Sequence, residues 1–259
     1  MAAARIFDDP PVIVGHRGMG TGMVGGFGEN TVDSLLAAAN VAPWIELDVR
    51  RTTDDVLVVG HQPALPDGTP VAEAPADDAV AAGLPVLEDV LDELPARTGV
   101  NLDVKSALED ALRSPDRTTA ALVAALAATA AKHRPVLFSS FDPAALGVVA
   151  RYAPHLPRSL ITWLWFPVGI AVAAAAGSGV QVLSVHVGSL EPNTIEPGVQ
   201  HPGVQRVVEV AHAAGLEVLT WCPEAAQLEA LLDAGVDALC VNDLPLVAAA
   251  VARRSADGA

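Results

Sequence analysis

Positive charge is scarce in this chain, and lysine is almost missing. The 259 residues carry 15 lysines and arginines against 31 aspartates and glutamates, which gives a net charge of −16. Such a balance argues against nucleic acid or an anionic membrane as partner, because phosphate groups would be repelled. The two lysines are Lys105 and Lys132. A lysine in such a chain is a candidate for a specific role.

Cysteine is equally rare, with Cys222 and Cys240 as the two examples. Two cysteines are too few for the disulfide framework of a small secreted domain, and they fit a reducing compartment. We interpret both as small buried hydrophobic side chains rather than as redox or catalytic groups. The first residues also lack the charged start and the long apolar stretch that export requires. A cytoplasmic location is therefore predicted.

Charge is absent altogether from residues 159–185, a run of 27 positions. By length alone this run could cross a bilayer, which takes about 20 apolar residues. Pro167 and the glycines at 169, 177 and 179 interrupt it, however. We expect a buried strand, helix and strand here, and no stable membrane insertion.

Apolar runs of strand character alternate with helical patterns over most of the chain. Such repeats predict a parallel sheet, and eight of them at this length indicate a closed (β/α)₈ TIM barrel. We predict one α/β domain over residues 1–259, with its core at about 12–253 and a short insertion after the second strand. The eight strands are expected at residues 12–14, 45–50, 100–105, 136–138, 160–162, 180–185, 217–221 and 238–241.

A glycine-rich loop at residues 19–28 contains the spacing Gly20-x-Gly22-x-x-Gly25. This spacing indicates a dinucleotide site only where it joins a strand directly to a helix. Here the loop starts well after the first strand, and the next helix is expected to begin later, at Asn30 or Thr31. We therefore interpret the segment as a loop and not as a nicotinamide site.

Two carboxylates stand out at the second strand. Glu46 and Asp48 are one residue apart, so their side chains point to the same face of the strand. Carboxylates placed together in a core repel each other unless a cation compensates them, and a hard divalent cation with oxygen ligands would do so. His16 and His61 end flanking apolar runs and would place two imidazoles beside this pair.

The strand ends carry further polar candidates, as the catalytic residues of a TIM barrel do. Asp103 and Lys105 end the third strand, Trp221 ends the seventh, and Asn242 follows the eighth. The indole of Trp221 could pack on a bound ligand or an organic cation, or simply fill the barrel rim.

Short motifs occur along nearly the whole chain: GHRG at 15–18, ENT at 29–31, IELDV at 45–49, VVGH at 58–61, LPVLE at 84–88, NLDVK at 101–105 and the segment 235–245. Together they resemble the glycerophosphodiester phosphodiesterase family, and the similarity runs nearly end to end. The glycine-rich insertion before Glu29 looks like that of the intracellular glycerophosphocholine-cleaving branch. The resemblance implies metal-dependent hydrolysis of small glycerophosphodiesters to glycerol 3-phosphate and an alcohol.

The resemblance also assigns roles to individual residues. It implies an acid and base pair of histidines, a Ca²⁺ or Mg²⁺ site made of three carboxylates, and cationic side chains that hold the phosphate. These are His16 and His61 for proton transfer, Glu46, Asp48 and Asp103 for the metal, and Arg17 and Lys105 for the phosphate.

This chain departs from the family pattern at two positions. Gln62 follows His61 where the family usually has Asp, and Asp103 stands where Glu is common.

Two other functions stay open. Lipid-acting lysophospholipase D and sphingomyelinase D relatives share the paired histidines and the Glu-x-Asp, and a barrel of this type can also be an inactive ligand-binding protein.

Overall fold

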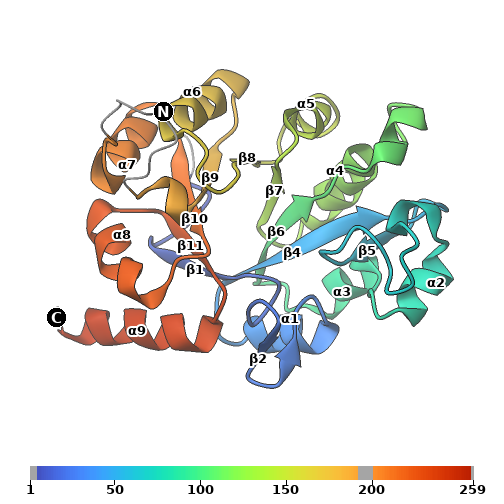
Figure 1. Ribbon diagram of the computed structural model, residues 1–259, viewed down its shortest axis with the longest axis horizontal. Helices are drawn as coiled ribbons and strands as arrows, with labels where there is room; N and C mark the ends of the chain where they lie inside the picture. Colours follow the sequence, from blue (N-terminus) through green and yellow to red (C-terminus); the bar gives the residue numbers. More distant parts are fainter. Residues whose placement is uncertain (1–4, 192–200, 258–259) are drawn as a thin grey trace.

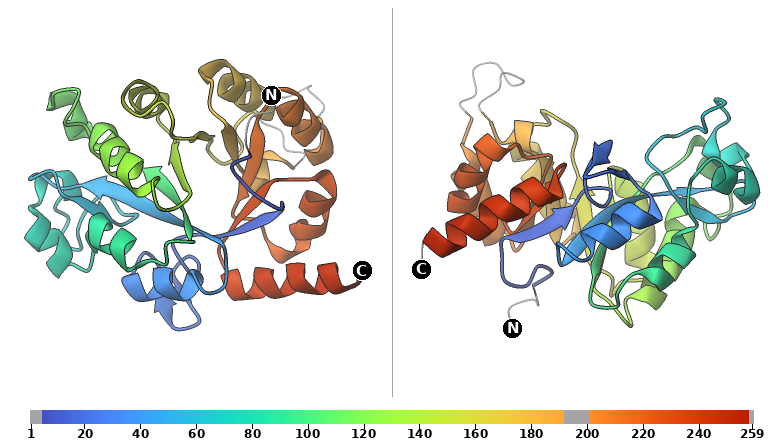
Figure 2. Two further views of the ribbon diagram at one scale, coloured as in Figure 1. Left: turned by 180° about the vertical axis from the view of Figure 1, so that it is seen from behind. Right: turned by 90° about the horizontal axis from the view of Figure 1, so that it is seen from below.

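The computed structural model describes residues 5–191 and 201–257, which form a closed barrel surrounded by helices (Figures 1 and 2). Neighbouring barrel strands pair in parallel, and the first pairs with both the second and the last, which closes the ring. The predicted TIM barrel is confirmed. Its eight strands are β1 (Val12–Gly15), β4 (Trp44–Arg51), β6 (Gly99–Val104), β7 (Val136–Ser140), β8 (Arg158–Ile161), β9 (Val182–His186), β10 (Glu217–Trp221) and β11 (Ala238–Val241).

One helix follows each of these strands and covers the outside of the barrel (Figure 1). Thr31 caps the first of them, because its hydroxyl accepts a hydrogen bond from Ser34 N, and the carboxylate of Asp142 caps another through Ala144 N. The helices are α1 (Val32–Ala38), α3 (Leu87–Glu93), α4 (Thr119–Ala130), α5 (Pro143–Tyr152), α6 (Val168–Ser178), α7 (Val204–Ala213), α8 (Leu228–Ala234) and α9 (Leu244–Asp257).

The side-chain alternation of β4 shows how the sequence builds the barrel. Ile45, Leu47 and Val49 belong to the large apolar core between the strands and the helices. Trp44, on the opposite face, packs inside the barrel, where the ring of Phe7 lies edge-on to it at 5.3 Å between centroids. The inner face of the same strand therefore starts apolar at the bottom of the barrel and becomes polar toward the top.

The insertion after the second strand is more structured than its sequence indicates. Strand β5 (Leu57–Val59) pairs antiparallel with the end of β4, so His61 follows an added strand and not a barrel strand. The 3₁₀ helix η1 (Val71–Glu73) and helix α2 (Ala76–Ala81) come next. A small apolar cluster of their own, made of Val58, Leu65, Val71, Ala74 and Ala79, holds this insertion together.

Two further expectations concern loops and membrane contact. The glycine-rich loop contains a small hairpin, β2 (Met23–Val24) with β3 (Phe27–Gly28), so it does not join a strand directly to a helix. Residues 159–185 span parts of β8, α6 and β9, which confirms the predicted strand, helix and strand. Within the two described ranges, no helix has the length and apolarity needed to cross a bilayer.

Candidate active site

Three buried carboxylates meet on the inner face of β4 and β6. Asp48 and Asp103 are direct partners in the register of these parallel strands, so their side chains lie next to each other. Glu46 lies two residues before Asp48 on the same face. One oxygen atom of each of the three lies within 4.8 Å of the others, and all three side chains are buried.

The turn after β1 places His16 and Arg17 over this cluster. The turn is tight: a Cβ on Gly15 would lie 2.2 Å from the carbonyl oxygen of Gly18, so only glycine fits there. Arg17 adopts a left-handed backbone conformation, with φ of 55°, and its backbone N–H donates a hydrogen bond to Glu46 Oε2 at 2.9 Å. The GHRG sequence thus ties the first strand to the carboxylates of the second.

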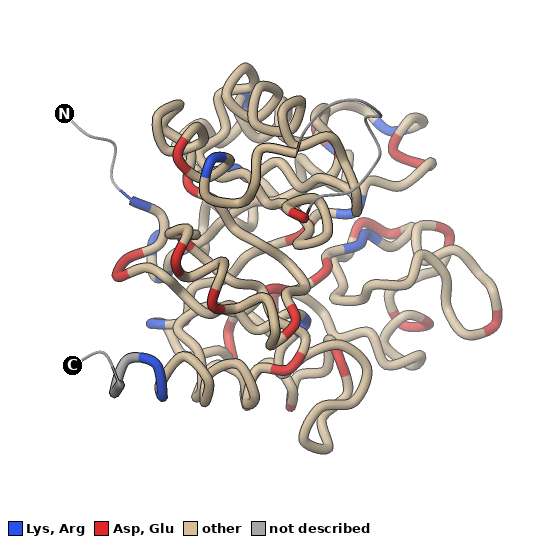
Figure 3. The backbone as a smooth tube through the Cα atoms, turned by 60° about the vertical axis from the view of Figure 1, so that its left-hand side comes forward, with Lys and Arg blue, Asp and Glu red and all other residues tan. Residues whose placement is uncertain are grey.

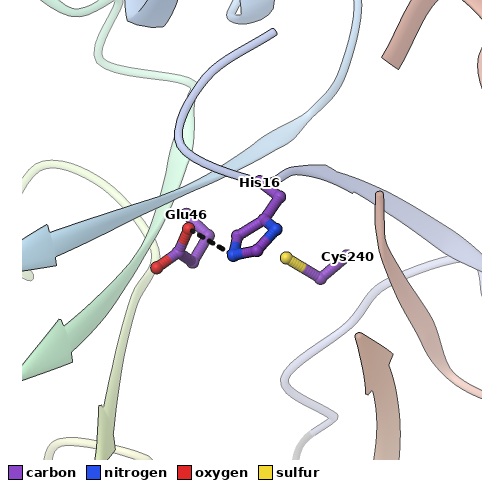
Figure 4. Close-up of side chains that lie close together, drawn as sticks. All are labelled: His16, Glu46 and Cys240. Atoms are coloured by element: carbon purple, nitrogen blue, oxygen red, sulfur yellow. Dashed lines mark ion pairs between the residues drawn. The ribbon is translucent and has the colours of Figure 1, made fainter. Parts of the chain in front are cut away.

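A side chain from the last strand end orients the ring of His16. Nδ1 of His16 lies 2.6 Å from the side-chain oxygen of Asn242, which accepts a hydrogen bond, so Nδ1 carries the proton. Nε2 then keeps its lone pair, and it lies 3.7 Å from Glu46 Oε2 (Figure 4). His16 can therefore accept a proton at Nε2.

Asp48 is surrounded by cationic and amide donors. Lys105 Nζ lies 2.9 Å from Oδ1 of Asp48 and also contacts Oδ2 of Asp103. Arg17 Nε lies 3.2 Å from Oδ2 of Asp48, and Asn30 Nδ2 donates to the same oxygen at 2.9 Å. Asn30 thus supports the site, while Thr31 caps the helix. Glu29 pairs with Arg17 Nη1 at 2.9 Å and holds that guanidinium in place.

The environment separates the pKa values of the three carboxyls. Burial would raise the pKa of Asp48, but Lys105 and Arg17 outweigh it and lower the pKa to about 2. Burial raises the pKa of Asp103 to about 6; Lys105 acts to lower this pKa, and the charge of Asp48 acts to raise it. Burial together with the charges of Asp48 and Asp103 raises the pKa of Glu46 well above its usual range. The cluster therefore carries more negative charge than its surroundings stabilise.

A divalent cation fits this cluster on chemical grounds. Oε1 of Glu46 and Oδ1 of Asp103 are buried and have no hydrogen-bond partner among the described residues. Unpartnered buried oxygens are costly, and an all-oxygen donor set suits hard cations such as Ca²⁺ or Mg²⁺. Glu46, Asp48 and Asp103 are the residues that could hold such an ion.

His61 faces the same cavity from the insertion. Its backbone carbonyl accepts two hydrogen bonds from the Arg50 guanidinium, at 3.2 Å from Nε and 2.6 Å from Nη2, which fixes this loop to β4. Nδ1 of its ring is buried without a partner among the described residues. Burial lowers the pKa of His61, so the ring is neutral near pH 7 and can act as a base. Gln62 is exposed to solvent.

The cavity has a volume of about 340 Å³ and two unlike walls. One wall is the charged cluster with both histidines, and the other is aromatic. Phe141 stacks on Trp163 with 4.2 Å between centroids, and Trp221 meets Phe141 edge-on at 6.0 Å. His186 does not line this cavity; its ring lies 4.4 Å from the Trp221 ring and supports it. The site thus offers an apolar surface beside a charged region.

The structure brings together every residue that the sequence proposed for the site. Seven of the nine line the cavity; Asp48 lies beneath them with its carboxylate on Lys105 and Arg17, and Asn242 binds the ring of His16. Sequence reasoning missed Arg50, Trp163 and Cys240, which also line it. The position of Arg50, two residues after Asp48, was a usable signal because side chains alternate along a strand. Trp163 and Cys240 gave no such signal.

Comparison with known proteins agrees with this geometry. The family model described as the glycerophosphoryl diester phosphodiesterase family matches residues 16–245. The chain belongs to this family. The resemblance to the family is confirmed, and so is the enzyme class, glycerophosphodiester phosphodiesterase; the likeness to the intracellular glycerophosphocholine-cleaving branch stays a prediction. A comparison with curated proteins finds no sequence match.

Solved structures of other proteins share the fold of this chain. One from Parabacteroides distasonis ATCC 8503, a glycerophosphodiester phosphodiesterase, is 23% identical, with 95% of this chain and 98% of that chain covered and a TM-score of 0.71. An Oleispira antarctica phosphodiesterase in complex with the product sn-glycerol-3-phosphate is 22% identical, with coverages of 93% and 96% and a TM-score of 0.70. A candidate enzyme of this class from Galdieria sulphuraria is 22% identical, with coverages of 92% and 98% and a TM-score of 0.75.

Proposed function

We propose that this phosphodiesterase hydrolyses small glycerophosphodiesters to glycerol 3-phosphate and an alcohol, with the help of a divalent cation. The observation that carries the proposal is one cavity lined by two imidazoles, by the three cationic side chains of Arg17, Arg50 and Lys105, and by members of a carboxylate cluster. The Oleispira antarctica structure, which holds sn-glycerol-3-phosphate, supports the same product here. A small-molecule substrate and a cytoplasmic location belong to this proposal.

The cation would be Ca²⁺ or Mg²⁺, held by Glu46, Asp48 and Asp103. When bound, it supplies positive charge that polarises a phosphoryl oxygen. Arg17 and Lys105 lie at the same cluster and add positive charge, which offsets the charge that develops on the phosphoryl oxygens. In the protein described here these two cations pair with carboxylates, so they are already positioned.

The two histidines carry the proton transfers in this proposal. One imidazole takes the proton from the attacking hydroxyl, and the other gives a proton to the leaving alkoxide, because imidazole titrates near neutral pH. Two features fit these roles: His61 is neutral near pH 7, as a base must be, and the hydrogen bond from His16 Nδ1 to Asn242 makes Nε2 the atom through which His16 takes up a proton and gives it to the leaving alkoxide. Arg50 holds the loop that carries His61.

The charge distribution fits a small substrate. Lysines and arginines are few and scattered among more numerous acidic residues (Figure 3). A polyanion such as nucleic acid needs several adjacent phosphate contacts along a basic surface. A single phosphodiester needs only the local positive charge that Arg17 and Lys105 provide.

The direct test uses glycerophosphocholine and protein stripped of metal by a chelator. We expect no release of glycerol 3-phosphate until Mg²⁺ or Ca²⁺ is added back, and release at a rate that saturates with the cation. Undiminished release by the chelated protein would refute the metal dependence. Failure to cleave glycerophosphocholine and other soluble glycerophosphodiesters under every cation would refute the substrate class.

One observation favours lipid phosphodiester hydrolysis as a second candidate. Trp163, Leu164 and Trp165, which follow β8, are 63%, 44% and 54% exposed, and Trp163 also lines the cavity. An apolar surface that continues from a pocket to solvent suits a single acyl chain. A lysophospholipid could then place its phosphodiester at the histidines and its chain along Trp163.

The Trp163→Ala variant distinguishes these two substrates. If an acyl chain packs on Trp163, kcat/KM for a short-chain lysophosphatidylcholine should fall about 10-fold or more, since lost apolar contact in a pocket costs about 1–3 kcal/mol. Glycerophosphocholine turnover should change less. Tyr152→Ala is the control, because Tyr152 is an exposed aromatic residue of α5 that neither lines the cavity nor belongs to this apolar surface. Equal losses with both substrates would argue against the acyl-chain path.

A further inference from the structure

Cys240 lies inside the barrel and next to the proposed catalytic residues. It sits on β11, where register pairs it with Val14 of β1, and it is 2% exposed. Its neighbours Leu239 and Val241 face the outer core, so the alternation of the strand turns the thiol inward. Donor atoms of His16, Glu46 and Cys240 lie within 4.8 Å of one another (Figure 4).

These three side chains form a donor set unlike the carboxylate cluster. Imidazole, carboxylate and thiolate together select Zn²⁺ and other thiophilic divalent ions, whereas Mg²⁺ and Ca²⁺ prefer oxygen ligands. Glu46 belongs to both sets. Its Oε2 atom lies 3.7 Å from His16 Nε2 and accepts one hydrogen bond, from Arg17 N, so a second lone pair of that oxygen is available for a ligand.

The hydrogen bonds around His16 leave its Nε2 atom ready for metal binding. Because the side-chain oxygen of Asn242 accepts a hydrogen bond from Nδ1–H, the lone pair of His16 is on Nε2, the nitrogen that lies 3.7 Å from Glu46 Oε2. A carbonyl oxygen bonded to the distal imidazole nitrogen is the usual support of a metal-binding histidine. Three protein ligands leave a fourth tetrahedral position for water.

We propose that His16, Glu46 and Cys240 form a second metal site, selective for Zn²⁺ and similar ions, whose occupation inhibits the enzyme. Binding displaces the thiol proton to solvent. It also takes the lone pair that His16 needs for proton transfer and the carboxylate that Glu46 would give to Ca²⁺ or Mg²⁺. The inhibition rests on the roles proposed above for His16 and Glu46; the binding itself does not.

The second cysteine provides a matched control. Cys222 Sγ also lies near His16, but at 3.7 Å from Nδ1, the nitrogen that carries the proton. Its other contact is the side-chain oxygen of Asn242, at 3.3 Å. Cys222 therefore sits on the side of the ring that cannot bind a metal. Removing its thiol should leave the proposed site intact.

Binding is tested with Co²⁺ as a spectroscopic probe for Zn²⁺. We expect the metal-stripped protein to develop the near-ultraviolet charge-transfer absorption of a thiolate bound to Co²⁺. The band should persist in Cys222→Ser and disappear in Cys240→Ser and Cys240→Ala, with thermal melts showing that both Cys240 variants fold. A band that survives without Cys240, or that never forms in the unmodified protein, would overturn the site.

Inhibition is tested by adding Zn²⁺ at a fixed Mg²⁺ concentration during glycerophosphocholine cleavage. The Cys240 variants should need at least about 10-fold more Zn²⁺ for half inhibition, which corresponds to about 1.4 kcal/mol of lost binding free energy. Cys222→Ser should behave as the unmodified enzyme. A cobalt band without any effect of Zn²⁺ on turnover would overturn the inhibitory role. If no glycerophosphodiester is cleaved at all, the cobalt spectrum still decides the site.

Discussion

Replacing His61 with alanine is expected to lower kcat about 10²- to 10⁴-fold, the usual contribution of a positioned acid or base. The fold should not suffer, because the ring of His61 faces the cavity and its Nδ1 makes no hydrogen bond among the described residues. His16→Ala should reduce kcat as much, with a modest loss of stability of about 1 kcal/mol because the side chain of Asn242 loses its hydrogen bond.

The pH profile of kcat/KM provides a further test of His61, because the direction of its pKa shift is known. Burial lowers its pKa, so the neutral ring persists to a lower pH than that of a free histidine, whose pKa is about 6.5. If His61 is the base, kcat/KM should fall as the pH drops through that lowered pKa. The midpoint of this acid limb should therefore lie below about 6.5.

His133→Ala provides the control for both histidine variants, since His133 is exposed and does not line the cavity. Its kcat and melting temperature should stay unchanged. Normal kcat in His61→Ala would refute the acid and base assignment. A higher KM at unchanged kcat would instead make His61 a binding residue.

The inner and outer faces of β4 explain why so much of the fold was readable from the sequence. Ile45, Leu47 and Val49 form an apolar run of strand character, and between them stand Glu46 and Asp48. Period two fixes which side chains share a face, and the barrel rule places the polar face at the strand ends. These local rules were enough to predict the strands and to group the site residues.

The parts that sequence reasoning missed depend on contacts between distant segments. The insertion has its own apolar cluster, which a Pro-rich and Ala-rich segment does not reveal. The interpretation of both cysteines as buried was wrong for Cys222, which is only partly buried, and correct for Cys240. Which neighbours it has, however, depends on the register of β11 with β1, and that register brings the thiol to His16.

The rarity of lysine was a better guide. Lys105 was singled out because the chain has only two lysines, and it proves to contact both Asp48 and Asp103. Its role toward the phosphate stays a prediction. Burial explains why these ion pairs form. Water does not reach the two carboxylates, so a cation in contact with them stabilises their charge.

Glu46→Gln is expected to abolish the response to metal and, at the same time, to stabilise the metal-free protein. Glu46 is 4% exposed, and both burial and the charges of Asp48 and Asp103 raise its pKa. At neutral pH the unfolded chain carries this carboxylate ionised at no cost, whereas the folded chain must bury it. Removing the charge should add about 1–3 kcal/mol to the free energy of unfolding, or about 2–10 °C in melting temperature.

The destabilising effect of the buried carboxylates can be checked by measuring the stability of the unmodified protein as a function of pH. A carboxyl whose folded pKa is raised destabilises the fold as the pH rises through the window between its unfolded and folded values. For Asp103 that window extends from its ordinary value of about 4 to about 6. The metal-free protein should therefore gain stability from this cluster on acidification from pH 7 toward pH 4, and Glu46→Gln should gain less, because one of the repelling charges is already gone.

Metal separates this variant from its control. Ca²⁺ or Mg²⁺ should raise the melting temperature of the unmodified protein, because a ligand that binds only the folded state stabilises it. Glu46→Gln should show no such rise and no metal-dependent turnover. Glu29→Gln removes a carboxylate that pairs with Arg17 but lies outside the metal cluster, so it should keep the metal response. If Glu46→Gln kept an unchanged metal response, the cation would have to bind elsewhere. The expected result, a Glu46→Gln protein that is more stable yet inactive, would show that the fold keeps these mutually repelling carboxylates because metal binding requires them.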